Sequence, residues 1–170
     1  FTQCYTGTAI CAPSRCVLMT GLHNGHTRVR DNKGIVGGVS EEQRVPLEPG
    51  DYTVAEMLKK AGYTNGITGK WGLGEPDTDG VPTRKGFDEW FGYLNQRKAH
   101  TYYPEYLCHN EDKVILEGNR NGQQNDYSHD MIFDFACDFI RASRAGPFFL
   151  YLPWTLPRGG YEIPGASAWD

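Results

Sequence analysis

The chain has 170 residues and a mass of 19.1 kDa, the size of one ordinary globular domain. Hydrophobic residues make up 39% of it and charged residues 22%, so the composition excludes a globally disordered chain. The 17 Lys and Arg against 21 Asp and Glu give a formal net charge of -4, which argues against a general attraction to nucleic acid. The longest apolar run, Phe148 to Leu152, is far below the roughly 20 residues of a membrane span.

The first residues and the cysteines indicate where the chain begins within a domain and in what state its thiols are. The chain starts at Phe1 without Met and without the basic and apolar regions of a signal peptide, so we expect it to begin inside a domain. Its five cysteines include no Cys-x-x-Cys pair, which argues against a zinc ribbon and a fully paired disulfide set. At least one of them must therefore be free, paired with another molecule or modified.

Two helices are predicted in the first third of the chain. The first covers Ser14 to Thr20 and stops at Gly21, which places Cys11 just before a helix N-terminus. Free backbone N–H groups and the helix dipole favour negative charge at such a place. The second helix begins at Thr53, which has capping-box spacing to Glu56, and ends before Gly62.

A strand and a loop follow the second helix. Residues 63 to 68 are typical of a short buried strand, and residues 69 to 74 form a glycine-rich loop at its carboxyl end. Lys70 in this loop is expected to project where open α/β sheets bind their ligands.

The later elements complete an α/β pattern. Residues 87 to 93 and 113 to 116 are strand-like, and residues 128 to 142 form an amphipathic helix. Residues 148 to 152 then form a strand that we expect to be buried on both faces. The alternation predicts a largely parallel sheet flanked by helices.

Two separate motifs carry a family resemblance. Cys11-Ala12-Pro13-Ser14-Arg15 with Thr20-Gly21, and Gly62-Tyr63-Thr64 with Gly69-Lys70-Trp71, resemble the two signatures of the sulfatase family. A softer likeness extends through residues 86 to 88 and 147 to 152. The resemblance implies an incomplete fold of the alkaline-phosphatase and sulfatase kind. Residues 1–170 would be a partial catalytic domain that lacks the family's first strand and C-terminal part.

The resemblance also implies a modified nucleophile at Cys11. In sulfatases this cysteine is converted to formylglycine, here by a formylglycine-generating or sulfatase-maturating enzyme as partner. A thiol would form an intermediate that is difficult to release, whereas an aldehyde hydrate attacks sulfur with one hydroxyl and expels sulfate through the other. One hard step then becomes two easier ones.

Further site residues follow from the same resemblance. Arg15 lies one helical turn after Cys11, so its guanidinium can reach the hydrate or the sulfate. Lys70 would donate to a sulfonate oxygen as the S–O bond breaks. The family favours Ca²⁺, held by carboxylates and the formylglycine, and Cys11 is the one such ligand in this chain. Asp31-Asn32 offers oxygen ligands too, but a turn is the favoured interpretation.

The sequence departs from the family pattern at three places. Gly72 stands where a histidine usually follows Gly-Lys-Trp, Leu22 replaces an arginine, and Arg158 replaces the histidine of a late Pro-His pair. Arg158 can bind an anion but cannot readily act as a general acid. His100 lies in a basic, tyrosine-rich segment suited to anions and sugar rings. We therefore predict that His100 approaches Cys11 and Lys70 and compensates for Gly72, and that Gly72→His partly restores activity.

Three functional hypotheses remain open. The leading one is a sulfuric ester hydrolase that cleaves a carbohydrate or aryl sulfate monoester in a sulfated small molecule or glycan. The alternatives are a phosphonate or phosphate monoester hydrolase of the same superfamily and a catalytically degenerate sulfatase-like binding protein. The family resemblance implies a periplasmic or secreted location, and neither nucleic acid nor a membrane span is expected.

Overall fold

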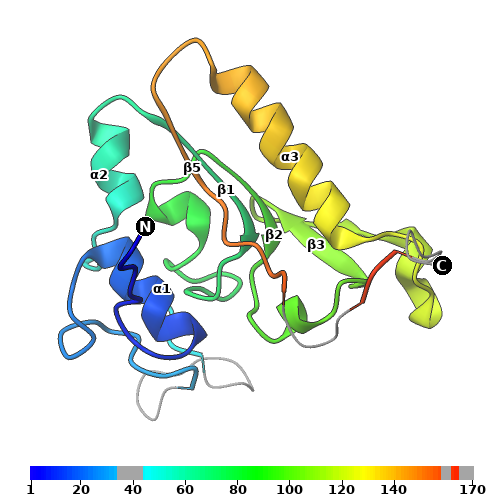
Figure 1. Cartoon of the computed structure of the whole chain (residues 1–170), viewed down its shortest axis with the longest axis horizontal. Coiled ribbons are helices and arrows are strands. Elements are labelled where there is room, and N and C mark those ends of the chain that lie inside the picture. The colour runs from blue at the N-terminus through cyan, green and yellow to red at the C-terminus, as the bar shows by residue number, and fades with distance from the viewer. Residues whose placement is uncertain (34–43, 158–161, 165–170) are drawn as a thin grey trace.

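The computed structural model describes residues 1–33, 44–157 and 162–164, which form a five-stranded sheet with helices around it (Figure 1). The helices and strands in chain order are α1 (Cys11–Thr20), α2 (Val54–Lys60), β1 (Thr64–Lys70), β2 (Glu89–Tyr93), β3 (Tyr106–His109), β4 (Asp112–Ile115), α3 (Ser128–Ser143) and β5 (Phe148–Tyr151). Three short 3-10 helices lie between them, η1 (Pro82–Lys85), η2 (Lys98–His100) and η3 (Glu117–Gly122). Within the described ranges, no helix is both long and apolar enough to cross a bilayer.

The sheet is mixed, in the order β4-β3-β2-β1-β5. Strand β1 is parallel to both β2 and β5, whereas β2, β3 and β4 form an antiparallel run. The predicted α/β fold is confirmed, but the parallel part is limited to three strands. The sequence pattern does not indicate β3, because its four residues are held by pairing with β2 and β4 rather than by a strong pattern of their own.

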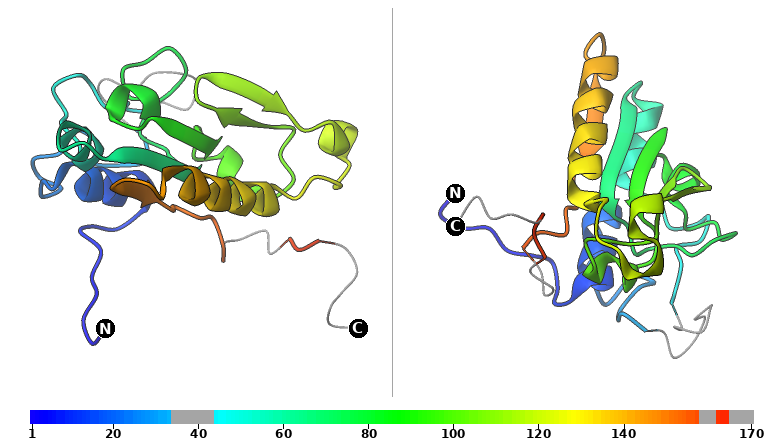
Figure 2. Two further views of the ribbon diagram at one scale, coloured as in Figure 1. Left: turned by 90° about the horizontal axis from the view of Figure 1, so that it is seen from above. Right: turned by 90° about the vertical axis from the view of Figure 1, so that its right-hand side faces the viewer.

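Helix α3 covers one side of the sheet, as both views of Figure 2 show. Its buried side chains include Ile132, Ala136 and Phe139. The Phe139 ring packs against β1 at Gly66, where an added Cβ would lie 2.6 Å from the ring. Glycine at this position therefore permits the close approach of helix and strand.

Several element boundaries agree with the predicted ones. Helix α2 begins at a capping box, in which Thr53 Oγ1 accepts from the Glu56 N–H and Glu56 Oε2 accepts from the Thr53 N–H. Helix α1 ends at Gly21, which adopts the left-handed conformation with φ 69°.

The predicted burial of the last strand is wrong. All four residues of β5 are half-buried rather than buried on both faces. In the described part of the chain β5 pairs only with β1 and so forms an edge of the sheet. A continuous apolar run thus marks an edge strand here, because periodicity alone does not separate edge strands from central ones.

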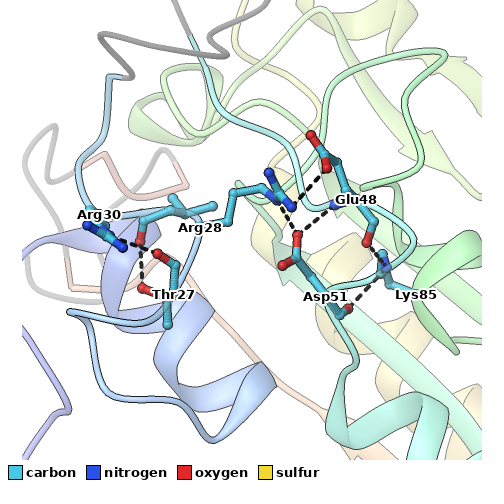
Figure 3. Close-up of polar contacts among 7 residues, drawn as sticks. Thr27, Arg28, Arg30, Glu48, Asp51 and Lys85 are labelled. Carbon is cyan, nitrogen blue, oxygen red and sulfur yellow. Dashed lines mark hydrogen bonds and ion pairs between the residues drawn. The ribbon is translucent and has the colours of Figure 1, made fainter.

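A polar network holds the loops between α1 and α2 (Figure 3). Arg28 pairs with the carboxylates of Glu48 and Asp51. The Lys85 ammonium, whose residue is 1% exposed, donates to the backbone carbonyls of the same two residues. Because a buried ammonium without acceptors is costly, these contacts fix the loop before α2 against η1.

Candidate functional site

Cys11 is the first residue of α1, not the residue just before the helix as predicted. It is half-buried, and within the described residues no disulfide joins any of the five cysteines. Cys11 lines a pocket of about 340 Å³ that also includes Ile10, Ser14, Arg15, Leu18 and Tyr151. The pocket thus lies at the junction of the first turns of α1 with the end of β5.

The chain enters α1 through a strained residue. Ile10 precedes Cys11 with φ 58° and has no side-chain cap to offer. A β-branched residue is rare in this conformation, so the surrounding structure must stabilise it. Part of that support comes from Asn32, whose Oδ1 accepts from the N–H of Ala12 at 3.0 Å. Asn32 therefore satisfies an N–H of the first turn of α1, next to Cys11.

Arg15 is fixed between α1 and the carboxyl ends of two parallel strands. Its Nη1 donates to the backbone carbonyl of Lys70, at the end of β1, at 2.6 Å and to the hydroxyl of Tyr151, at the end of β5, at 3.5 Å. Burial raises the pKa of Tyr151 while the nearby guanidinium opposes that rise. The phenol is therefore neutral at working pH, and Arg15 provides the positive charge of the pocket.

Lys70 belongs to β1 and not to the predicted glycine-rich loop. Gly69 and Lys70 pair in register with Gly92 and Tyr93 of β2, which extends the strand by two residues beyond the predicted end. Lys70 is 1% exposed, so it is not a solvated surface lysine. Its backbone accepts the bond from Arg15, while its side chain is not part of the lining of the Cys11 pocket.

The side chain that packs against Gly72 belongs to Gln96. Gly72 has φ 76°, and an added Cβ would lie 3.2 Å from Gln96 Cβ. Gln96 is 3% exposed, and its Nε2 donates at 2.7 Å to the same Asn32 oxygen that holds Ala12. Its Oε1 has no hydrogen-bond partner within the described ranges. A chain of contacts thus joins the position of the missing histidine to the first turn of α1.

The remaining predicted site residues are not brought to this pocket by the described structure. His100 is exposed at the end of η2 and does not line the Cys11 pocket, so its approach to the nucleophile stays a prediction. Arg158 lies outside the described residues. Over residues 1–33, 44–157 and 162–164, no group of three or more His, Cys, Asp or Glu side chains has the geometry to hold a metal ion. The described part of the chain therefore does not itself fit a calcium site.

The sequence analysis does not predict the contacts that Tyr151, Asn32 and Gln96 make at this site. Tyr151 had a usable signal, because the carboxyl ends of parallel strands meet at one edge of a sheet. The sequence indicates Asn32 only as an oxygen ligand or a turn residue and does not indicate Gln96, because the hydrogen bond between them joins loops 64 positions apart in the chain.

The comparisons with known proteins identify the family of this chain. Residues 1–154 match the sulfatase family, and the chain belongs to that family. N-acetylgalactosamine-6-sulfatase of Rattus norvegicus is 33% identical over 92% of this chain, and an arylsulfatase of Hemicentrotus pulcherrimus is 32% identical over 91% of it. The chain spans about a third of the length of these relatives, 32% and 30% respectively.

Solved structures show the same fold. The crystal structure of Ps i-CgsB in complex with k-i-k-neocarrahexaose superposes with a TM-score of 0.73 at 24% sequence identity. The match covers 94% of this chain and 37% of that one. The fold of this chain therefore corresponds to part of a larger fold in that protein.

Proposed function

We propose that the protein containing this chain is a sulfuric ester hydrolase that cleaves a sulfate monoester with formylglycine derived from Cys11. One observation carries the proposal. Cys11 and Arg15 share a pocket at the start of α1, and Arg15 is held there by the ends of β1 and β5. A nucleophile and a fixed cation at one pocket are the pair that attack on an anionic ester requires.

Each residue of the chain has a defined part in this proposal. Converted to formylglycine, residue 11 supplies one hydroxyl for attack on sulfur and a second one through which sulfate is released. Arg15 balances the charge of the sulfate, because its guanidinium stays protonated at every working pH. Lys70 is proposed to donate to a sulfonate oxygen, and His100 and Arg158 to contact the substrate. Calcium is also proposed, with Cys11 as one ligand and most ligands beyond this chain.

The substrate class is proposed from the relatives and the chemistry together. A relative at 33% identity is named for the 6-sulfate of N-acetylgalactosamine, which supports a sulfated carbohydrate, and another is named as an arylsulfatase, which keeps aryl sulfates as the second candidate. A maturation enzyme that oxidises Cys11 is the implied protein partner. A periplasmic or secreted location is part of the same proposal, and cell fractionation tests it.

Hydrolysis assays on the full-length protein, produced with a maturation enzyme, test the proposal. N-acetylgalactosamine 6-sulfate and 4-nitrophenyl sulfate are compared with 4-nitrophenyl phosphate, and Cys11→Ala is the control. We expect release of sulfate from at least one sulfate ester and loss of nearly all of it in Cys11→Ala. Faster release of phosphate than of sulfate would favour the phosphoesterase alternative. No turnover of any ester by the matured protein would favour a binding protein.

A further inference from the structure

A second pocket, of about 280 Å³, lies beside the end of β2 and has both apolar and charged walls. Its charged side chains come from three parts of the fold, Glu75 after β1, Lys98 in η2 and Lys113 in β4. Leu94 and Tyr106 form part of its remaining wall. The proposed reaction at Cys11 uses none of these residues.

Two ammonium groups converge on one ring in this pocket. Lys98 Nζ lies 3.8 Å and Lys113 Nζ 4.9 Å from the centroid of the Tyr106 ring, and Lys98 also donates to the Tyr106 hydroxyl. Neither ammonium forms an ion pair with a carboxylate of the described residues. Two like charges held at one ring repel each other, and an anion between them would offset that repulsion.

The rest of the pocket suits a sugar rather than a bare ion. Glu75 lines the pocket, is 8% exposed and accepts at Oε1 from Asn95 Nδ2 at 3.2 Å, so the wall includes a carboxylate residue held in place, a type of group that accepts from sugar hydroxyls. Leu94 and Pro76 supply apolar surface for the face of a ring. Acceptor, apolar wall and paired cations together match a sugar that carries an anionic group.

The pocket is linked to the Cys11 site through its own wall. Asn95 lines it, and the next residue, Gln96, donates to the Asn32 oxygen that holds Ala12 in the first turn of α1. Tyr93, also on its wall, pairs in register with Lys70. Hydrogen bonds and strand pairing at the carboxyl ends of β1 and β2 therefore connect the walls of the two pockets.

We propose that this pocket is a subsite for a neighbouring sugar of an anionic oligosaccharide, whose sulfate or carboxylate lies between Lys98 and Lys113. The choice of an anionic oligosaccharide as the ligand rests on the proposed function. It makes the preferred substrate an oligosaccharide rather than an isolated aryl sulfate.

Binding measurements test the subsite directly. Full-length protein carrying Cys11→Ala, which prevents turnover, is titrated by calorimetry with a chondroitin 6-sulfate tetrasaccharide and with the unsulfated chondroitin tetrasaccharide. The double substitution Lys98→Ala and Lys113→Ala is expected to weaken binding of the sulfated tetrasaccharide about tenfold or more. Lys60→Ala is the matched control, because Lys60 Nζ lies 4.6 Å from the centroid of the Tyr52 ring elsewhere on the surface.

Comparison of the sulfated and unsulfated tetrasaccharides shows whether the group bound by the lysines is a sulfate or a carboxylate. If the bound group is a sulfate, the lysine dependence disappears with the unsulfated tetrasaccharide, and if it is a carboxylate, the dependence persists. Equal affinities of the double variant and its parent for both ligands would overturn the proposal, as would an equal loss in Lys60→Ala or no measurable binding at all. Because binding and not turnover is measured, the subsite is tested even if the protein hydrolyses no sulfate ester.

Discussion

Arg15 connects the nucleophile to the sheet through a single side chain. Its guanidinium bonds to the Lys70 carbonyl and the Tyr151 hydroxyl, while its backbone lies one helical turn after Cys11. A planar guanidinium with five donors in a fixed fork can hold two acceptors and still present several N–H groups to a substrate, whereas an ammonium that held both would keep a single donor. The geometry of the pocket therefore depends on arginine specifically and not on positive charge alone.

Replacing Arg15 with lysine tests this dependence. Arg15→Lys keeps the charge but loses the fork, so we expect kcat for a sulfate ester to fall about 10²-fold or more. Tyr151→Phe is the control, because it removes only the 3.5 Å contact, and its loss should stay below about tenfold. Steady-state kinetics of the two variants provide the measurement. Turnover of Arg15→Lys at the parent rate would show that charge alone is sufficient.

Gly72 is a second residue whose role follows from its backbone. The sequence alone favours Gly72→His as a gain of a missing imidazole, but φ 76° and the contact with Gln96 make any side chain unfavourable there. We expect Gly72→His to lower the free energy of unfolding by about 1 to 3 kcal/mol and not to restore activity.

Two other glycines serve as control positions that distinguish the effect of backbone strain on stability from the effect of steric contact. Gly62 has φ 85° with open space around it, so Gly62→Ala measures the backbone strain alone, and Gly50→Ala has neither strain nor crowding. Denaturant unfolding should rank Gly72→Ala as more destabilising than Gly62→Ala and both above Gly50→Ala. A Gly72→Ala variant as stable as Gly50→Ala would show that neither strain nor crowding matters at this position.

Among the elements, the sequence predicts local structure better than strand position. The capping box at Thr53, the stop at Gly21 and the spacing of apolar residues in α3 are local signals, and each is confirmed. The burial of β5 and the existence of β3 depend on which strands become neighbours. Pairing between distant segments leaves no pattern within either segment, so these two features could not be predicted.

In the candidate site too, the sequence predicts the local features but not those that depend on contacts between distant segments. The sequence predicts that its motif residues Cys11 and Arg15 lie close together, because they are one helical turn apart. The placement of Lys70 inside β1, with its burial, came from pairing with β2. Asn32 and Gln96 meet through loops that are far apart in the chain, so nothing in either loop indicates their contact.

The first turn of α3 carries a pH-dependent contact. The His129 ring packs edge-on against Trp154 with centroids 5.2 Å apart, and burial lowers the pKa of His129 from its ordinary value of 6.5 although Asp130 opposes the shift. The unfolded chain therefore binds the proton more readily than the folded one. Stability from this group is present above about pH 6.5 and is lost as the pH falls toward the folded pKa.

Thermal unfolding at two pH values tests this contact. Between about pH 7.5 and about pH 5.5, we expect the parent protein to lose more Tm than His129→Gln, which has no proton to bind in this range. The same loss of Tm in both proteins would show that His129 is not linked to unfolding.

At the scale of the whole molecule, the chain corresponds to only part of its relatives in the sulfatase family. It spans about a third of its relatives' length. Its described residues include the position of the proposed nucleophile and the cation beside it, but no cluster of side chains that could hold a metal ion. The proposed function therefore depends on one covalent event at Cys11, because Arg15, Lys70 and the pocket have their proposed roles only around a modified residue.

The state of Cys11 in the matured full-length protein is the most direct test. Cys4 and Cys11 have no Lys or Arg between them, so one tryptic peptide carries both and Cys4 is the internal control. After alkylation, mass spectrometry should show an alkylated Cys4 and an aldehyde at position 11 that reacts with a hydrazide probe. Complete alkylation of both cysteines in protein made with a competent maturation enzyme would contradict the proposed function.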